Sequence, residues 1–202
     1  MKNWKYILLS VILFPLVGMV SSCSEESAKT GEFDNWQQRN DEAVNQWAAN
    51  TSLRKIKTFS KDPSSTGTNA DYIYVQVLET GNGADSPLFN DTARVAYRGY
   101  FIPTASYSDG YVFDQNYIGD FSWSTAGMTD FAITSNLCDG FSTALMNMHK
   151  GDRWRVYMAY QLGYGTTMSG SIPAYSNLIF DIALQDFWHP GDVHPSFKAR
   201  KK

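Results

Sequence analysis

The hydrophobic positions are most regular between Leu137 and Gly151, where they recur with the period of an α-helix. Asp139 is placed to cap the first free N–H groups, Lys150 lies in the last expected turn, and Gly151 follows as a left-handed C-cap. A helix this short is marginal alone in water, so its apolar face must pack on another element. We expect it to lie across a curved sheet, with Phe141 pointing into the space between them. Four apolar residues at i, i+3, i+4 and i+7 form that face: Phe141, Ala144, Leu145 and Met148.

Segments on both sides of this helix have the alternation or the composition of β-strands. In the last of them, residues 178–184, we expect Phe180 to face inward and Asp181 outward. Residues 153–159 alternate, with one side formed by Trp154, Val156 and Met158. Runs of β-branched and aromatic residues predict further strands at 72–78, 92–101, 111–114 and 131–133. Five or so antiparallel strands and one short helix make a half-covered sheet, which is an α+β fold.

A second helix is predicted ahead of the sheet, over residues 33–49. Trp36, Ala43 and Trp47 share a stripe along it, and Asn40 lies on the same line. Such a stripe suits packing on the main domain, a spacer role or a contact between two copies. The oligomeric state therefore stays open.

The N-terminus has the form of an export signal. Lys2 and Lys5 precede an apolar run at 6–20 that is short for a membrane span. The run ends in Val20-Ser21-Ser22-Cys23, which resembles the lipobox of bacterial lipoproteins. In that class the peptide is cut before the cysteine, and the cysteine carries the lipids. We expect lipidation of Cys23, with an ordinary secretory signal and an incidental cysteine as the alternative.

A chain anchored in this way would reside in the bacterial cell envelope, held at the outer membrane by its lipids alone, on the periplasmic or the surface face. Glu25 and Glu26 resemble the signal that sends some Gram-negative lipoproteins to the surface. The loop-like composition of residues 60–70 marks a boundary. The predicted division is a signal peptide at 1–22, a tether and helical extension at 23–70, the main domain at 71–188 and a C-terminal tail at 189–202.

Composition narrows the classes of function. The formal net charge is −3, which gives no electrostatic support for nucleic-acid binding. The two cysteines, Cys23 and Cys138, and the three histidines show no metal-ligand spacing, so we expect neither a metal nor a cofactor. No Ser-His-Asp set, phosphate loop or pair of catalytic carboxylates stands out. Aromatic residues make up 15% of the chain, which suits either cross-strand core pairs or an aromatic pocket.

Six short motifs follow one another across residues 71–188. They are Val95-Ala96-Tyr97-Arg98-Gly99, Asp109-Gly110-Tyr111-Val112-Phe113-Asp114, Leu137-Cys138-Asp139-Gly140-Phe141, the segment 145–152, Leu162-Gly163-Tyr164-Gly165 and the segment 172–181. In this order and spacing they resemble the FKBP-type peptidyl-prolyl cis-trans isomerases. The resemblance implies a curved antiparallel β-sheet wrapped around one short central α-helix, preceded here by the N-terminal helical extension. It also implies a proline pocket between sheet and helix, proline-containing polypeptides as partners, and macrolides as possible ligands.

Carried over residue by residue, the resemblance implies which side chains build that pocket. The Cys138 N–H and Tyr164 would bind substrate carbonyls, and Asp114 would orient Tyr97. Phe121 competes with Phe131 for one wall position, because the segment 115–130 is longer than in the family. The full set implied by the motifs is Tyr97, Phe113, Asp114, Phe131, Leu137, Cys138, Phe141, Tyr164, Ile172 and Phe180.

Three positions depart from the family pattern. Phe141 stands where a tryptophan usually floors the pocket, Cys138 shortens one wall, and Met168 lies near a frequent histidine. Two functions from different classes therefore follow from the sequence. One is a prolyl isomerase that assists folding of envelope proteins. The other is a noncatalytic FKBP-like surface lipoprotein that binds polypeptides or glycans.

Overall fold

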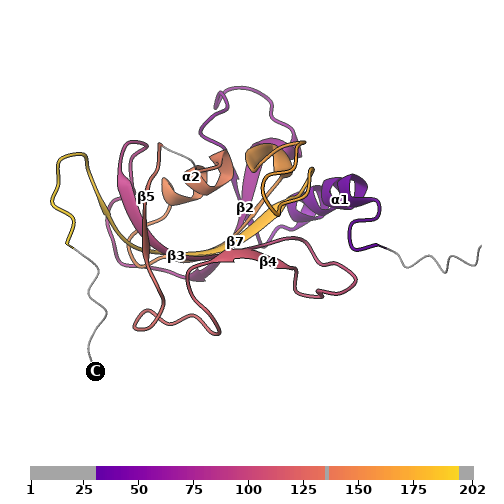
Figure 1. Cartoon of the computed structure of the whole chain (residues 1–202). Helices are drawn as coiled ribbons and strands as arrows, with labels where there is room; N and C mark the ends of the chain where they lie inside the picture. Colours follow the sequence, from indigo (N-terminus) through magenta and orange to yellow (C-terminus); the bar gives the residue numbers. More distant parts are fainter. Residues whose placement is uncertain (1–30, 135–136, 196–202) are drawn as a thin grey trace, which may run out of the picture.

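The computed structural model describes residues 31–134 and 137–195. Their main feature is a curved antiparallel sheet in the order β1-β2-β6-β7-β3-β4, with β5 also paired to β3. Figure 1 shows the short helix α2 on the concave side of this sheet and α1 at one end of it. The two helices are α1 (Trp36–Ala49) and α2 (Asp139–Leu145), and the strands are β1 (Arg54–Lys57), β2 (Tyr72–Glu79), β3 (Thr92–Tyr100), β4 (Val112–Gln115), β5 (Thr129–Ala132), β6 (Arg153–Met158) and β7 (Leu178–Trp188).

The predicted α+β architecture is confirmed, and every predicted strand is present with slightly different ends. The alternation in β6 places Trp154, Val156 and Met158 in the core, as expected. Two single-turn 3-10 helices were not predicted: η1 (Asn69–Asp71) begins at the end of the loop-like segment 60–70, and η2 (Tyr160–Leu162) follows β6.

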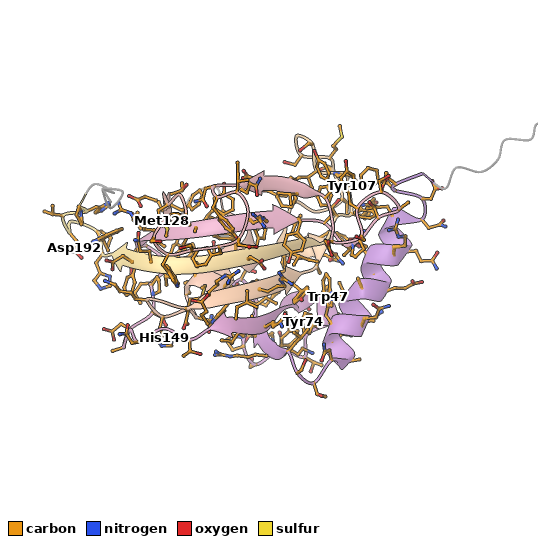
Figure 2. The ribbon with its side chains drawn as sticks, turned by 90° about the horizontal axis from the view of Figure 1, so that it is seen from below. Trp47, Tyr74, Tyr107, Met128, His149 and Asp192 are labelled. Carbon is orange, nitrogen blue, oxygen red and sulfur yellow. The ribbon has the colours of Figure 1, made fainter. Side chains whose placement is uncertain are left out.

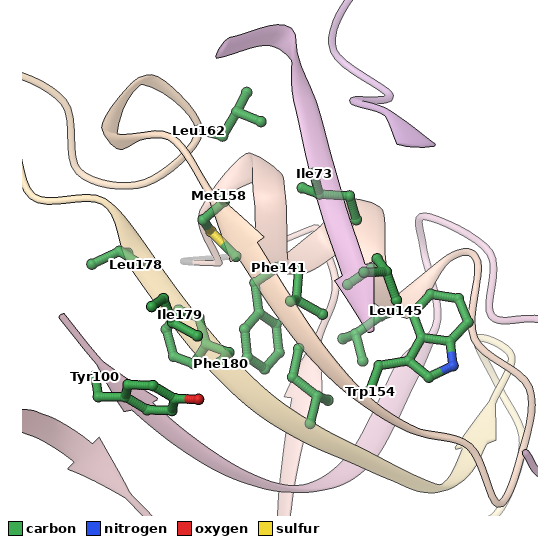
Figure 3. Packing of buried hydrophobic residues seen from close by; sticks show 14 of the residues in the cluster. Ile73, Tyr100, Phe141, Leu145, Trp154, Met158, Leu162, Leu178, Ile179 and Phe180 are labelled. Carbon is green, nitrogen blue, oxygen red and sulfur yellow. The ribbon is translucent and has the colours of Figure 1, made fainter. Parts of the chain in front are cut away.

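The helix α2 is shorter than the pattern suggested. Its regular part ends at Leu145, and the chain turns from there to Gly151, whose φ of 91° is the expected left-handed conformation. Asp139 does not cap the helix, because it is already the first helical residue and Cys138 occupies the N-cap position without a side-chain hydrogen bond. The apolar face is buried as predicted, and Figure 3 shows Phe141 and Leu145 within the main core.

One strand was missed. Residues 54–57 form β1, an edge strand paired with β2, although they were assigned to the N-terminal extension. The sequence Arg-Lys-Ile-Lys has one apolar residue, so it carries no alternation to detect. The sheet therefore begins before the boundary predicted at 60–70.

The helix predicted over 33–49 is confirmed from Trp36 onward, and it packs on the domain. Trp36 joins the main core, while Val44 packs in a smaller cluster with Tyr74 and Ala159. In Figure 2 the helix runs across one end of the sheet, with Trp47 on the side that faces the strands. Among the described residues, no helix is long and apolar enough to cross a membrane.

The outer face of the sheet is more covered than expected. Residues of the long segment between β4 and β5, including Tyr117 and Ala126, pack there on Ala96 and Ala183. Asp181 does point to this face, opposite Phe180, but it is 6% exposed rather than solvated. It forms an ion pair with Arg155, its cross-strand neighbour, at 2.7 Å.

Candidate functional site

A cavity of about 220 Å³ lies between the concave face of the sheet and the N-terminal end of α2. This volume is below the range of roughly 300–1,000 Å³ that is usual for drug-sized ligands, so the cavity suits a single small ring or side chain. We name it the aromatic pocket. Its lining residues are Tyr97, Phe113, Asp114, Phe131, Leu137, Cys138, Phe141, Tyr164 and Phe180.

The rings of the pocket support one another mostly edge to face. Phe141 and Phe180 lie 5.0 Å apart at an interplanar angle of 86°, and Figure 3 shows the Phe141 ring directed from α2 toward β7. Tyr97 and Phe131 lie 5.6 Å apart, and Phe113 and Phe180 also lie 5.6 Å apart. This geometry is favourable for aromatic quadrupoles, so the rings stabilise one another's positions.

Gly99 permits two of these rings to meet. A Cβ atom at this position on β3 would lie 2.5 Å from Phe180 and 2.6 Å from Phe113. Any side chain would push both rings aside. The glycine of the motif at 95–99 is therefore required by ring packing.

The polar side chains of the pocket are hydrogen-bonded to each other across neighbouring strands. The Tyr97 hydroxyl on β3 donates a hydrogen bond of 2.8 Å to Asp114 Oδ2 on β4. Asn116 follows β4 and bonds to β3 between the stretches that pair with β4 and with β5. Its side-chain oxygen accepts a hydrogen bond from the Tyr97 N–H, and its side-chain amide donates one to the Val95 carbonyl. These two bonds fix the backbone of β3 beside Tyr97. Sequence reasoning missed Asn116, and an isolated asparagine in a long segment gave no signal.

Two phenols face the pocket. Burial, followed by the hydrogen bond to Asp114, raises the pKa of Tyr97 above its ordinary value. Burial also raises the pKa of Tyr164. Both groups are therefore protonated donors at neutral pH. The Tyr97 hydroxyl already donates to Asp114. The Tyr164 hydroxyl donates to no other described residue, so it can donate a hydrogen bond to a ligand.

Cys138 contributes an uncharged wall. Its Sγ lies 3.7 Å from Met158 Sδ, and burial raises the pKa of the thiol to about 11. A protonated thiol is a poor nucleophile. The pocket therefore offers aromatic surface and hydrogen-bond donors, while covalent chemistry at this cysteine is disfavoured. No group of three or more possible metal-binding side chains occurs in the described residues.

The structure brings nine of the ten predicted site residues around the one cavity. Ile172 is the exception: it is buried in the main core, and it is absent from the pocket lining. Phe131 lines the pocket, whereas its rival Phe121 packs with Tyr117 and Trp123 on the other face of the sheet. Cys23 lies outside the described residues.

The family of the chain follows from comparison with known proteins. Residues 83–185 match the family model described as FKBP-type peptidyl-prolyl cis-trans isomerase. The chain belongs to this isomerase family. It is therefore an FKBP-type protein, and the motifs from Val95 to Asp181 correctly indicated both the family and the fold.

Relatives of the FKBP-type chain extend over most of its length. It is 27% identical over 180 residues to the macrophage infectivity potentiator of Trypanosoma cruzi, covering 89% of this chain and 80% of that protein. It is 30% identical over 144 residues to the FKBP-type isomerase FkpA of Escherichia coli (strain K12), covering 71% of this chain and 46% of FkpA. The chain thus spans about half the length of FkpA. The crystal structure of FkpA from Escherichia coli matches with a TM-score of 0.56 at 25% identity, over 78% of this chain and 61% of that one.

Proposed function

We propose that the chain catalyses cis-trans isomerisation of Xaa-Pro bonds, with the proline ring held in the aromatic pocket. The observation that carries the proposal is the convergence of nine residues from β3, β4, β5, α2, β7 and two connecting segments on one cavity of about 220 Å³. Family membership supports the same activity and proline-containing polypeptides as its substrates.

The chemistry requires neither an acid nor a base. An Xaa-Pro amide prefers trans by only about 0.5–1 kcal/mol, but it isomerises in tens to hundreds of seconds. The barrier of about 18–20 kcal/mol exists because rotation breaks amide resonance. A planar amide is strongly polarised and the twisted amide is not. A dry aromatic pocket therefore favours the twisted form, which is catalysis by differential binding.

In this proposal the pocket residues have three different roles. The rings of Phe113, Phe131, Phe141 and Phe180 would grip the pyrrolidine and exclude water. Tyr164 and the Cys138 N–H would hold the substrate carbonyls while the bond turns. Asp114 would orient Tyr97 through their 2.8 Å hydrogen bond.

The decisive experiment is the rate of cis-to-trans isomerisation of a short Xaa-Pro peptide with purified residues 24–202. We expect acceleration, and we expect a macrolide FKBP ligand to block it. Acceleration that survives both the ligand and the Phe113→Ala change would place catalysis elsewhere. A folded domain that gives no acceleration would overturn the proposal and favour the noncatalytic polypeptide- or glycan-binding function.

We further propose that the protein acts on envelope proteins from a lipid anchor at Cys23. The support is the lipobox-like Val20-Ser21-Ser22-Cys23 and the polar segment that follows it. Metabolic labelling with a lipid precursor should mark the wild-type chain and leave Cys23→Ser unlabelled. Equal labelling of both forms would refute the anchor, and proteinase treatment of whole cells would separate the surface face from the periplasmic face.

A further inference from the structure

The loop that carries Tyr164 is closed at its base by a buried asparagine. This loop comprises residues 159–177, between β6 and β7. Asn177 is fully buried, and its Oδ1 accepts a 2.9 Å hydrogen bond from the Tyr160 N–H at the other end of the loop. Within the loop the Gly165 N–H donates to Tyr160, and the Tyr175 N–H donates to Gly165. The Gly163 N–H also donates to the Tyr160 carbonyl, so both neighbours of Tyr164 are tied to the base.

That base is held in turn by the N-terminal helix. Asn40 of α1 is fully buried, and its Oδ1 accepts a 2.8 Å hydrogen bond from the Asn177 N–H. The Asn40 carbonyl accepts a second one, of 2.6 Å, from the Asn177 side-chain amide. The Asn40 amide donates to the Trp36 carbonyl, so each polar atom of its side chain has a partner. These bonds join residues 137 positions apart in the sequence.

Trp36 makes a second connection to the same loop. Its Nε1 donates a 2.9 Å hydrogen bond to Ser176 Oγ, which itself donates to the Pro173 carbonyl at 2.7 Å. The Trp36 ring also packs edge to face on Phe101 at 6.1 Å. Phe101 stacks at 5.0 Å on Phe113, a wall of the pocket. Helix α1 is thus connected indirectly to two sides of the aromatic pocket, through the loop of residues 159–177 and through Phe101. Figure 1 shows it beside the loops at that end of the sheet.

We propose that α1 is a positioning element of the isomerase site, and that Asn40 and Trp36 are positioning residues that set the place of Tyr164. The proposal rests on the proposed isomerase function and extends it to a helix that lies outside the matched family region of residues 83–185. Neither Asn40 nor Trp36 lines the aromatic pocket. They act through the loop of residues 159–177.

The physical reason is the cost of unpaired polar groups. Without the Asn40 side chain, the buried Asn177 N–H loses its acceptor, and an unsatisfied buried donor is costly. The base of the loop would then rearrange to find water or another partner. Catalytic groups must be held within about 0.5 Å of their productive position, so movement of the base displaces Tyr164 enough to slow the reaction.

The test compares the Asn40→Ala variant with a matched control variant, both as residues 24–202. Asn45→Ala is that control, because Asn45 is exposed on the same helix and its side chain accepts a hydrogen bond from exposed Asn69 rather than from the loop. We expect Asn40→Ala to lower kcat/KM for an Xaa-Pro peptide by about tenfold, and Asn45→Ala to leave it within about twofold. Amide hydrogen exchange should rise selectively in residues 163–176 of Asn40→Ala, while β6 and α2 keep their protection.

Trp36→Phe separates the hydrogen bond from the packing. It keeps a ring against Phe101 and removes the donor to Ser176, so it should raise exchange in the loop with a smaller loss of kcat/KM. Uniform loss of protection over the whole domain, with kcat/KM unchanged in the folded fraction, would overturn the positioning role. If wild type shows no isomerase activity, the proposed function fails, and the exchange measurement still decides whether α1 orders the loop.

Discussion

The hydroxyl of Tyr97 donates a 2.8 Å hydrogen bond to Asp114 Oδ2, from β3 to the neighbouring β4. This contact joins the ring at the centre of the aromatic pocket to the carboxylate at its rim. Tyr97 contacts Phe131, Phe141 and Phe180. A change at Asp114 is therefore transmitted to a ring that contacts three others in the pocket.

Removal of the carboxylate should slow the reaction without unfolding the protein. Asp114→Ala frees the Tyr97 ring, and we expect kcat/KM to fall by about tenfold, the equivalent of one hydrogen bond to a charged group. The free energy of unfolding should change little, because Asp114 is exposed. Peptide isomerisation kinetics and urea denaturation measure the two effects.

Asp120→Ala is the control, since it removes an exposed carboxylate from outside the pocket. Tyr97→Phe combined with Asp114→Ala should cost no more than the larger single change, because the two residues act as a pair. Additive losses in this double-mutant cycle would contradict the coupling.

Two phenylalanines on opposite faces of the sheet offer a matched comparison. Phe131→Leu removes edge contacts to Tyr97 and Phe141, each about 0.5–1.5 kcal/mol, and should lower kcat/KM by about tenfold. Phe121→Leu alters the cluster with Tyr117 and Trp123 and should leave kcat/KM within about twofold. A larger effect from Phe121→Leu would reverse the assignment of the pocket wall.

The buried ion pair on the outer face predicts a stability effect. Asp181→Ala leaves the Arg155 guanidinium without its partner, and we expect a loss of about 2–3 kcal/mol in the free energy of unfolding. This expected loss of stability is smaller than the loss for fully buried ion pairs, because the Arg155 side chain is 37% exposed. Asp186→Ala breaks the exposed pair with Lys150 and should cost under about 1 kcal/mol. Equal losses in urea denaturation would refute the distinction.

A histidine after β7 predicts a pH dependence of stability. His189 Nδ1 lies 2.8 Å from Oδ1 of the buried Asp91, and the hydrogen bond to that carboxylate raises the pKa of His189 above 6.5. Because the pKa is raised in the folded state, the protonated histidine stabilises the fold. Its contribution is fully present below the unfolded pKa of about 6.5 and is lost as pH rises through the folded value.

The melting temperature of the His189→Gln variant tests whether the stabilisation by His189 falls as pH rises. The difference in Tm between wild type and variant should be largest at about pH 5.5 and should shrink by about pH 8.5. The neighbouring carboxylates of Asp192 and Asp85 also raise the pKa of His189, so the difference in Tm includes their attraction for the protonated ring and has the same sign. A difference that grows with pH would contradict the assignment.

Much of the fold was accessible from local patterns. The two-residue period of 153–158 agrees with burial, because buried and half-buried residues alternate along β6. The apolar face around Phe141 is buried as well, but the polar residues Ser142 and Thr143 on the other side of α2 are also buried. The FKBP-like motifs named ten site residues, and nine of them line one cavity. The periods lie within short stretches and the motifs follow a recognisable order along the chain, so neither signal depends on knowing which segments meet in space.

Other features had no local signal. The strand β1 has one apolar residue and exists because β2 offers an unpaired edge. Ile172 was placed in the pocket by motif order, but the turn that pairs it with Ser169 directs it into the core. Asp181 alternates outward as expected, yet Arg155 and Tyr100 cover it.

The sequence by itself indicated the family, the central helix, the alternating strands and most of the residues that line the cavity, because hydrophobic period and motif order can both be read along the chain. Only the tertiary structure decided that Asn40 meets Asn177, and that the N-terminal helix belongs to the domain rather than to a tether. Buried polar partners are selected by geometry between segments far apart in the chain, and an asparagine on a helix gives no indication of which backbone it will satisfy.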